Sequence, residues 1–113
     1  MEKMIVILLV LFCALLGATG QIFFKMASEH FSFNILSMLQ NYRLLIGIAL
    51  YATSALLFVY ALKFGNLSIL YPIIATSYIW VAIMAHFFLG EPFAPLKWVG
   101  IAAIIAGVFL IAK

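Results

Sequence analysis

Charged residues are scarce in this sequence. Of its 113 residues, 8% are Asp, Glu, Lys or Arg and 69% are hydrophobic, whereas soluble domains carry about 25% charged and about 45–50% apolar residues. This deficit excludes an ordinary soluble domain and indicates an integral membrane protein. The six basic residues form no cluster, so nucleic acid is not expected as a partner.

Cysteine and proline are rare as well. The single cysteine, Cys13, excludes an internal disulfide and is expected to be a small buried side chain. Of the three prolines, Pro72 is predicted to loosen the start of a helix, because it lacks a backbone donor. Pro92 and Pro95 mark the end of one helix and the first turn of the next, with Gly90 as the C-terminal cap.

Motifs of enzyme chemistry are also missing. The residue pattern offers no plausible metal cluster, nucleophile triad or phosphate-binding loop. We therefore expect a protein that is not an enzyme and that uses no metal or cofactor.

Four apolar runs, at about 4–24, 44–62, 67–89 and 93–112, occupy nearly the whole chain. Each is close to the roughly 20 residues that a helix needs to cross about 30 Å of hydrocarbon. We expect an all-α integral membrane protein with one four-helix domain over residues 1–113, its helices at about 4–28, 43–63, 67–90 and 95–112. Four short helices enclose a path poorly, so a dimer or a partner subunit is expected.

Basic residues are divided evenly between the two expected membrane faces. They are Lys3, Lys63 and Lys113 on one face, and Lys25, Arg43 and Lys97 on the other. The positive-inside rule then gives almost no bias. Dual topology leading to an antiparallel homodimer is one hypothesis, and a fixed orientation set by a paralogous partner subunit is the alternative. The linker at residues 29–42 mixes polar and apolar residues, which suits a segment lying at the interface.

The first expected helix, at about 4–28, contains Gln21 and Lys25, one helical turn apart. Residues three or four apart share a helix face, so Gly17, Gln21 and Lys25 lie on one stripe. Lys25 is either a ligand for an anionic group or an anchor that snorkels to the interface. Gln21 lies too deep to snorkel well, so its amide must face protein, water or a ligand. A structural hydrogen bond between helices is the alternative for Gln21.

The third apolar run places Tyr71, Tyr78 and His86 near one face. The two tyrosines are candidate substrate-binding residues, whereas His86 reads as a solvated or core histidine. Glu91 joins the candidate set, with an interfacial carboxylate as the alternative. A slot with a fixed cation and hydroxyls suits an anionic head group, because a phosphate accepts charge-assisted hydrogen bonds from Lys and neutral ones from Gln and Tyr.

The last apolar run carries small residues at Gly100, Ala103 and Gly107. Small residues four apart allow helix backbones to approach closely in a membrane, where no hydrophobic drive exists between helices. The stripe is therefore a predicted helix-packing and dimer surface. Its partner is either the third helix of the same chain or the last helix of another copy.

Three segments carry a family resemblance: GQIFFKMAS at 20–28, LSILYPIIATSYIWVAIMAHFFLGEP at 67–92 and PLKWVGIAAIIAGVFLI at 95–111. They resemble the EamA-like, four-helix branch of the drug/metabolite transporter superfamily, and within it the paired small subunits of the aminoarabinose-undecaprenyl-phosphate flippase. The resemblance covers nearly the whole chain apart from residues 30–43. It implies a multi-pass transporter of the prokaryotic cytoplasmic (inner) membrane, with a membrane lipid or lipid-linked sugar as its partner.

The chain also resembles the small multidrug resistance family, antiparallel dimers that exchange cationic compounds for protons. The likeness fails at Gly17, which stands where those exporters carry their essential membrane carboxylate, and no acid follows Glu2 in the first helix. Tyr71 falls on that family's substrate-facing tyrosine, and residues 100–107 fall on its dimerising stripe. A slot without the acid and with a lysine nearby implies an anionic amphiphile as the substrate.

We therefore expect a flippase subunit that moves an undecaprenyl-phosphate-linked sugar or a similar anionic lipid carrier between leaflets. Gln21 and Lys25 would hold the phosphate, and Tyr71 and Tyr78 would line the sugar path.

Two alternatives remain at this level. One is an exporter of small organic cations or metabolites that uses Glu91 or His86 in place of the missing acid. The other is an accessory subunit that only packs against a larger partner through its last helix.

Overall fold

The structure is a computed structural model that describes residues 2–92 and 94–112. The described residues form helices and connecting turns, with no strand among them. The helices are α1 (Lys3–Ser28), α2 (Ile35–Gln40), α3 (Tyr42–Leu62), α4 (Leu67–Ile74), α5 (Ser77–Leu89) and α6 (Pro95–Ala112). Phe93, at the start of the fourth expected apolar run, and Lys113, one of the cations in the expected charge balance, lie outside the described residues.

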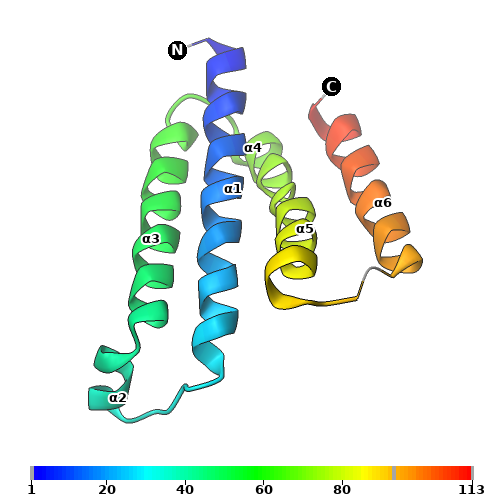
Figure 1. Ribbon diagram of the computed structural model, residues 1–113. Coiled ribbons are helices and arrows are strands. Elements are labelled where there is room, and N and C mark those ends of the chain that lie inside the picture. The colour runs from blue at the N-terminus through cyan, green and yellow to red at the C-terminus, as the bar shows by residue number, and fades with distance from the viewer. Residues whose placement is uncertain (1, 93, 113) are drawn as a thin grey trace.

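The helices that cross the membrane stand side by side in a thin layer. Figure 1 shows α1 between α3 on one side and α4 with α5 on the other, and α6 at the edge. The principal extents of 46 × 36 × 19 Å describe a slab. Three helical stretches are long and apolar enough to span a membrane, and α6 supplies a shorter apolar helix. The expectation of an all-α membrane protein with about four spans is confirmed.

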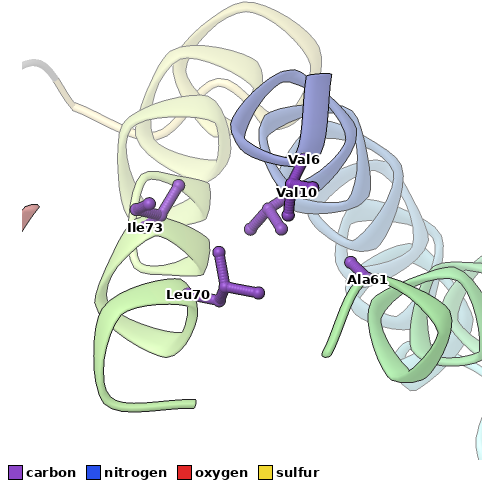
Figure 2. Close-up of a cluster of buried hydrophobic side chains, with 5 residues drawn as sticks. All are labelled: Val6, Val10, Ala61, Leu70 and Ile73. Atoms are coloured by element: carbon purple, nitrogen blue, oxygen red, sulfur yellow. The ribbon is translucent and has the colours of Figure 1, made fainter. Parts of the chain in front are cut away.

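A small apolar cluster holds the N-terminal half of α1 to its neighbours. It consists of Val6 and Val10 from α1, Ala61 from α3, and Leu70 and Ile73 from α4. Figure 2 shows these side chains meeting between the three helices. The stability of this contact comes from close packing, since lipid is as apolar as these side chains. The cluster fixes the angle between α3 and α4 on the two sides of α1.

Close contact between α1 and α3 depends on glycine. An added Cβ at Gly20 would lie 3.1 Å from the carbonyl oxygen of Gly47 and 3.2 Å from the backbone nitrogen of Tyr51. An added Cβ at Gly47 would lie 2.8 Å from the ring of Phe24. The two backbones therefore approach as only small residues allow.

The third span is interrupted, whereas the sequence predicted one helix over 67–90. α4 ends at Ile74, directly after the turn that contains Pro72, and α5 begins at Ser77. Ala75 and Thr76 donate to carbonyls three residues back, at 3.0 and 3.1 Å, in place of regular α-helical bonds. The break therefore falls after Pro72 rather than at the start of the span. Gly90 caps α5 with a φ of 71°, which confirms its expected role.

The segment between α1 and α3 contains a helix that the sequence did not predict. α2 is six residues long, and the Oδ1 atom of Asn34 accepts a hydrogen bond from the Leu36 backbone N–H at 2.9 Å to cap it. Figure 1 places α2 at one end of the layer, beside the start of α3. An interfacial location of this segment stays a prediction.

Candidate functional site

A cavity of about 310 Å³ lies where α1, α3, α4 and α5 meet. α1 contacts α3, α4 and α5, so it forms the floor of the cavity while the other helices form the walls. Small side chains of the floor make the room: Cys13, Ala14 and Gly17 all line the cavity. An added Cβ at Gly17 would lie 3.2 Å from the Ser54 hydroxyl oxygen. Gly17 is therefore the point at which a larger side chain would begin to fill the space.

Uncharged polar groups from every wall face this cavity. They are Gln21 of α1, Tyr51 and Ser54 of α3, Tyr71 of α4, and Ser77 and Tyr78 of α5. Tyr71 and Tyr78 are 62% and 60% exposed in the single chain. The Gln21 amide has no hydrogen-bond partner among the described residues, so its two donors and its acceptor are available to a ligand.

Two interactions fix the walls of the cavity. The Ser54 hydroxyl donates to the carbonyl oxygen of Cys13 at 2.7 Å, which ties α3 to α1. The rings of Phe58 and Tyr71 meet edge to face, with centroids 6.2 Å apart, and link α3 to α4. The cavity is therefore held by contacts from both sides of α1.

The break in the third span brings the two candidate tyrosines to this cavity from different helices. Tyr71 comes from α4 and Tyr78 from α5, with Ala75 of the break also in the lining. The hydroxyl of Thr76 is buried without a hydrogen-bond partner among the described atoms. It does not bond back to a carbonyl of the preceding helical turn. The interruption thus leaves polar groups at the depth of the cavity.

The structure groups three of the five predicted substrate residues. Gln21, Tyr71 and Tyr78 line the cavity, whereas Lys25 and Glu91 do not. Lys25 is exposed and lies one turn beyond Gln21 on α1. Glu91 follows the end of α5, where its carbonyl oxygen lies 2.9 Å from Nδ1 of His86.

The small-residue stripe of α6 has open space beside its two glycines. An added Cβ at Gly100 or Gly107 would meet no atom within 4 Å, and Ala103 is exposed. α6 packs on α4 through a different face, with Ile101 buried and Val108 against the apolar cluster. Two partners were expected for this stripe: the third span of the same chain, or the last helix of another copy. The glycines do not pack against the third span of the same chain.

Sequence reasoning missed several polar residues of the cavity. Tyr51 and Ser54 were overlooked because α3 reads as uniformly apolar, although they lie three residues apart and so share a face. Ser77 was missed as well, because a serine in a helix can also bond to its own helical backbone. No group of three or more His, Cys, Asp or Glu side chains that could hold a metal occurs within residues 2–92 and 94–112.

Apolar spanning helices around a cavity that contains uncharged polar side chains suit a membrane transporter, and the sequence comparisons agree. The model of the EamA-like transporter family matches residues 41–113, more than half of the chain. The chain belongs to the EamA-like transporter family. It is a multi-pass membrane protein and a transporter by family.

Individual relatives cover different parts of the chain. A protein of Sinorhizobium fredii, named y4nH and described as uncharacterized, is 38% identical over 68 residues, covering 59% of this chain and 58% of y4nH. A Pseudomonas savastanoi pv. phaseolicola protein is named "Probable 4-amino-4-deoxy-L-arabinose-phosphoundecaprenol flippase subunit ArnE". It is 28% identical over 109 residues, covering 94% of this chain and 96% of its own length. A protein of the same name from Escherichia coli is 28% identical over 108 residues, with the same coverage. No solved structure matches the chain.

Proposed function

We propose that the chain is a subunit of a flippase that moves a polyprenyl-phosphate-linked sugar, or a similar anionic lipid carrier, across the prokaryotic cytoplasmic membrane. The observation that carries the proposal is the uncharged cavity between membrane-spanning helices, which is lined by uncharged polar side chains together with apolar ones. Likeness over 94% of the chain to proteins named as flippase subunits supports it.

The chemistry of the cavity suits a sugar. Hydroxyl groups of a sugar both donate and accept hydrogen bonds, and the amide of Gln21 and the hydroxyls of Ser54, Ser77, Tyr71 and Tyr78 offer both kinds of partner. Aromatic rings give these polar groups an apolar body that stays compatible with the membrane. Hydrogen bonds to the cavity would thus replace the hydrogen bonds to water that a sugar loses on entering the hydrocarbon.

The phosphate of the carrier belongs at the end of the cavity nearest Lys25. Lys25 is one turn from Gln21, so a head group whose sugar contacts Gln21 brings its phosphate within reach of the ammonium group. We therefore assign the sugar to Gln21 and the phosphate to Lys25, because Gln21 lines the cavity and Lys25 does not. Glu91 remains a predicted substrate residue, although it does not line the cavity.

A second subunit would complete the path. The layer is 19 Å thick along its shortest axis, so both of its faces are open. The stripe of Gly100, Ala103 and Gly107 is the proposed contact, with a second copy in antiparallel orientation or with a paralogous subunit.

A cation exporter is the competing function, and the cavity favours it less. The residues that line the cavity include no Asp or Glu, so no carboxylate is placed there to bind a cation or to exchange it for a proton. The two functions differ in the charge of the substrate that is moved.

The test is flipping in proteoliposomes. A polyprenyl-phosphate sugar with a fluorescent label is followed by its loss of accessibility to an added quencher, and uptake of a quaternary ammonium compound is measured in parallel. We expect flipping by the wild-type protein and a rate at least about tenfold lower for Gln21→Ala and Tyr78→Phe, since each removes a hydrogen bond to the sugar.

The matched control removes a hydroxyl outside the cavity. Thr53→Ala on α3 removes a hydroxyl that bonds only to the carbonyl oxygen of Ala49, at 2.7 Å, and should keep the wild-type rate. Uptake of the quaternary ammonium compound without movement of the lipid would reverse the assignment.

A further inference from the structure

A second recess lies at the membrane face where α1 ends and α3 begins. Its volume is about 330 Å³, and it shares no residue with the cavity. The lining consists of residues that can hydrogen bond: His30, Ser37, Gln40, Asn41, Tyr42 and Arg43. We propose that this recess, the α2 recess, binds the phosphate of an anionic membrane lipid, with Arg43 as its principal ligand.

The charge of the α2 recess is positive and uncompensated. Arg43 forms no ion pair with any carboxylate of the described residues, and no Asp or Glu lines the recess. The guanidinium lies over the Tyr42 ring, 5.5 Å from its centroid, which orients the group and leaves its edge to donate. A planar guanidinium matches the two oxygens of a phosphate and donates two parallel hydrogen bonds. His30, Ser37 and Gln40 supply further donors.

The walls of the α2 recess are held in place by one side chain. Asn41 accepts a hydrogen bond from the Leu44 backbone N–H at 3.3 Å and donates to the carbonyl oxygen of Ala27 at 3.1 Å. These bonds join the end of α1 to the start of α3. The N-terminus of α3, a helix of 21 residues, adds a favourable dipole for an anion at this position.

The depth of the α2 recess identifies the occupant as a lipid. α2 exposes Ile35, Leu36 and Leu39 by 73%, 63% and 62%, and Figure 1 places it at the end of the spanning helices. An apolar face at this position lies at the boundary between acyl chains and head groups, where lipid phosphates are the abundant anions. A zwitterionic lipid fits less well, because its ammonium group would find no carboxylate in the lining.

The experiment counts lipids retained by the purified protein in native mass spectrometry. Phosphatidylglycerol and phosphatidylcholine are offered with identical acyl chains, and inorganic phosphate is added as a competitor. We expect phosphatidylglycerol to be retained at a concentration at least about tenfold lower than phosphatidylcholine, and Arg43→Gln to remove that preference.

Two further variants serve as controls for the Arg43→Gln result. Lys3→Gln removes one cation from a recess of about 370 Å³ at the opposite face, lined mostly by apolar residues, and should keep the preference. Arg43→Lys keeps the charge without the planar fork, and should reduce the preference to an intermediate value even if Arg43→Gln does not fold.

Several results would count against this proposal, and each has its own consequence. Equal retention of both lipids by the wild-type protein, or equal losses in Lys3→Gln and Arg43→Gln, would overturn the site. Displacement of phosphatidylglycerol by millimolar inorganic phosphate would identify a soluble phosphate as the ligand and would overturn the lipid assignment. Because the α2 recess is separate from the cavity, loss of the preference in Arg43→Gln with normal flipping would leave the proposed transport function intact.

Discussion

The contact between α1 and α3 and the outer face of α6 both contain glycine, yet their surroundings are opposite. At Gly20 and Gly47 an added Cβ would meet backbone or ring atoms at 2.8 to 3.2 Å. At Gly100 and Gly107 it would meet nothing within 4 Å. The first pair is used to bring two helices of one chain together, and the second pair is left unused by the same chain.

This difference divides the chain into a packed part and an open part. α1, α3 and α4 bury the apolar cluster and form the cavity with α5, whereas α6 contacts mainly α4 at the edge of the layer. Glycine without a close neighbour weakens a helix. The open stripe is the proposed contact with another subunit, and four predictions test the division into a packed and an open part, from the largest effect to the smallest.

The largest effect is expected from Gly20→Val. The new side chain would be forced against the backbone of α3, and overpacking of this kind costs about 1–3 kcal/mol or more. We expect loss of folded protein or a much lower melting temperature in detergent, measured by circular dichroism. Gly100→Val makes the same chemical change in open space and should keep the wild-type melting curve of the monomer. Equal effects of the two variants would contradict the division.

Next comes loss of the proposed dimer in Gly100→Leu combined with Gly107→Leu. The bulky side chains would separate the helices of the two proposed subunits while leaving the fold of each intact, since an added Cβ at either glycine would meet no atom within 4 Å. We expect dimerisation to weaken at least about tenfold, or by about 1.4 kcal/mol, as measured by cross-linking across a concentration series. Ala102→Leu, at an exposed position on a different face of α6, is the control and should dimerise normally.

A smaller effect is expected where the packed part borders the cavity. Gly17→Ala would place its methyl group 3.2 Å from the Ser54 hydroxyl, a side chain that can rotate, whereas Gly20→Ala meets backbone atoms that cannot. We expect Gly17→Ala to destabilise by about 1 kcal/mol, within the range for one added methyl group, and Gly20→Ala by more. Thermal unfolding of the two variants in the same detergent measures the difference, and the reverse order would be inconsistent with the packing.

The smallest effect is expected from Ser54→Ala. The variant removes the 2.7 Å hydrogen bond to the Cys13 carbonyl and leaves that carbonyl without it. Hydrogen bonds between spanning helices contribute about 0.6 kcal/mol on average, so the melting temperature should fall by a few degrees at most. Ser68→Ala, at an exposed position near the start of α4, should have no effect. A loss as large as that of Gly20→Val would show that the hydrogen bond, rather than the glycine contact, holds α1 to α3.

The spanning helices were predictable from the sequence because hydropathy and length decide which segments cross a membrane. Capping by Gly90 was also predictable, since a glycine before a proline ends a helix for local reasons. The break between α4 and α5 was not predicted, because Pro72 shows that a helix is weakened without showing which of the following turns gives way. α2 was missed because six residues carry little periodicity.

The candidate site was predictable only along single helices. Tyr71 and Tyr78 were found from their spacing, and Gln21 from its depth in an apolar run. Tyr51 and Ser54 could not be assigned, because their place in the cavity depends on how closely α3 approaches α1 at Gly20 and Gly47. Helical spacing placed Lys25 on the stripe of Gln21, but the extent of the cavity, which ends before Lys25, is a property of the packed helices.

Binding of undecaprenyl phosphate to the purified protein tests the proposed function most directly. Native mass spectrometry would compare the wild-type protein with Lys25→Ala, and with Lys63→Ala as a matched loss of one exposed lysine at the other end of the helices. We expect selective retention of undecaprenyl phosphate over phosphatidylcholine, lost in Lys25→Ala and kept in Lys63→Ala. Retention no better than that of phosphatidylcholine, or retention unchanged in Lys25→Ala, would contradict the proposed function.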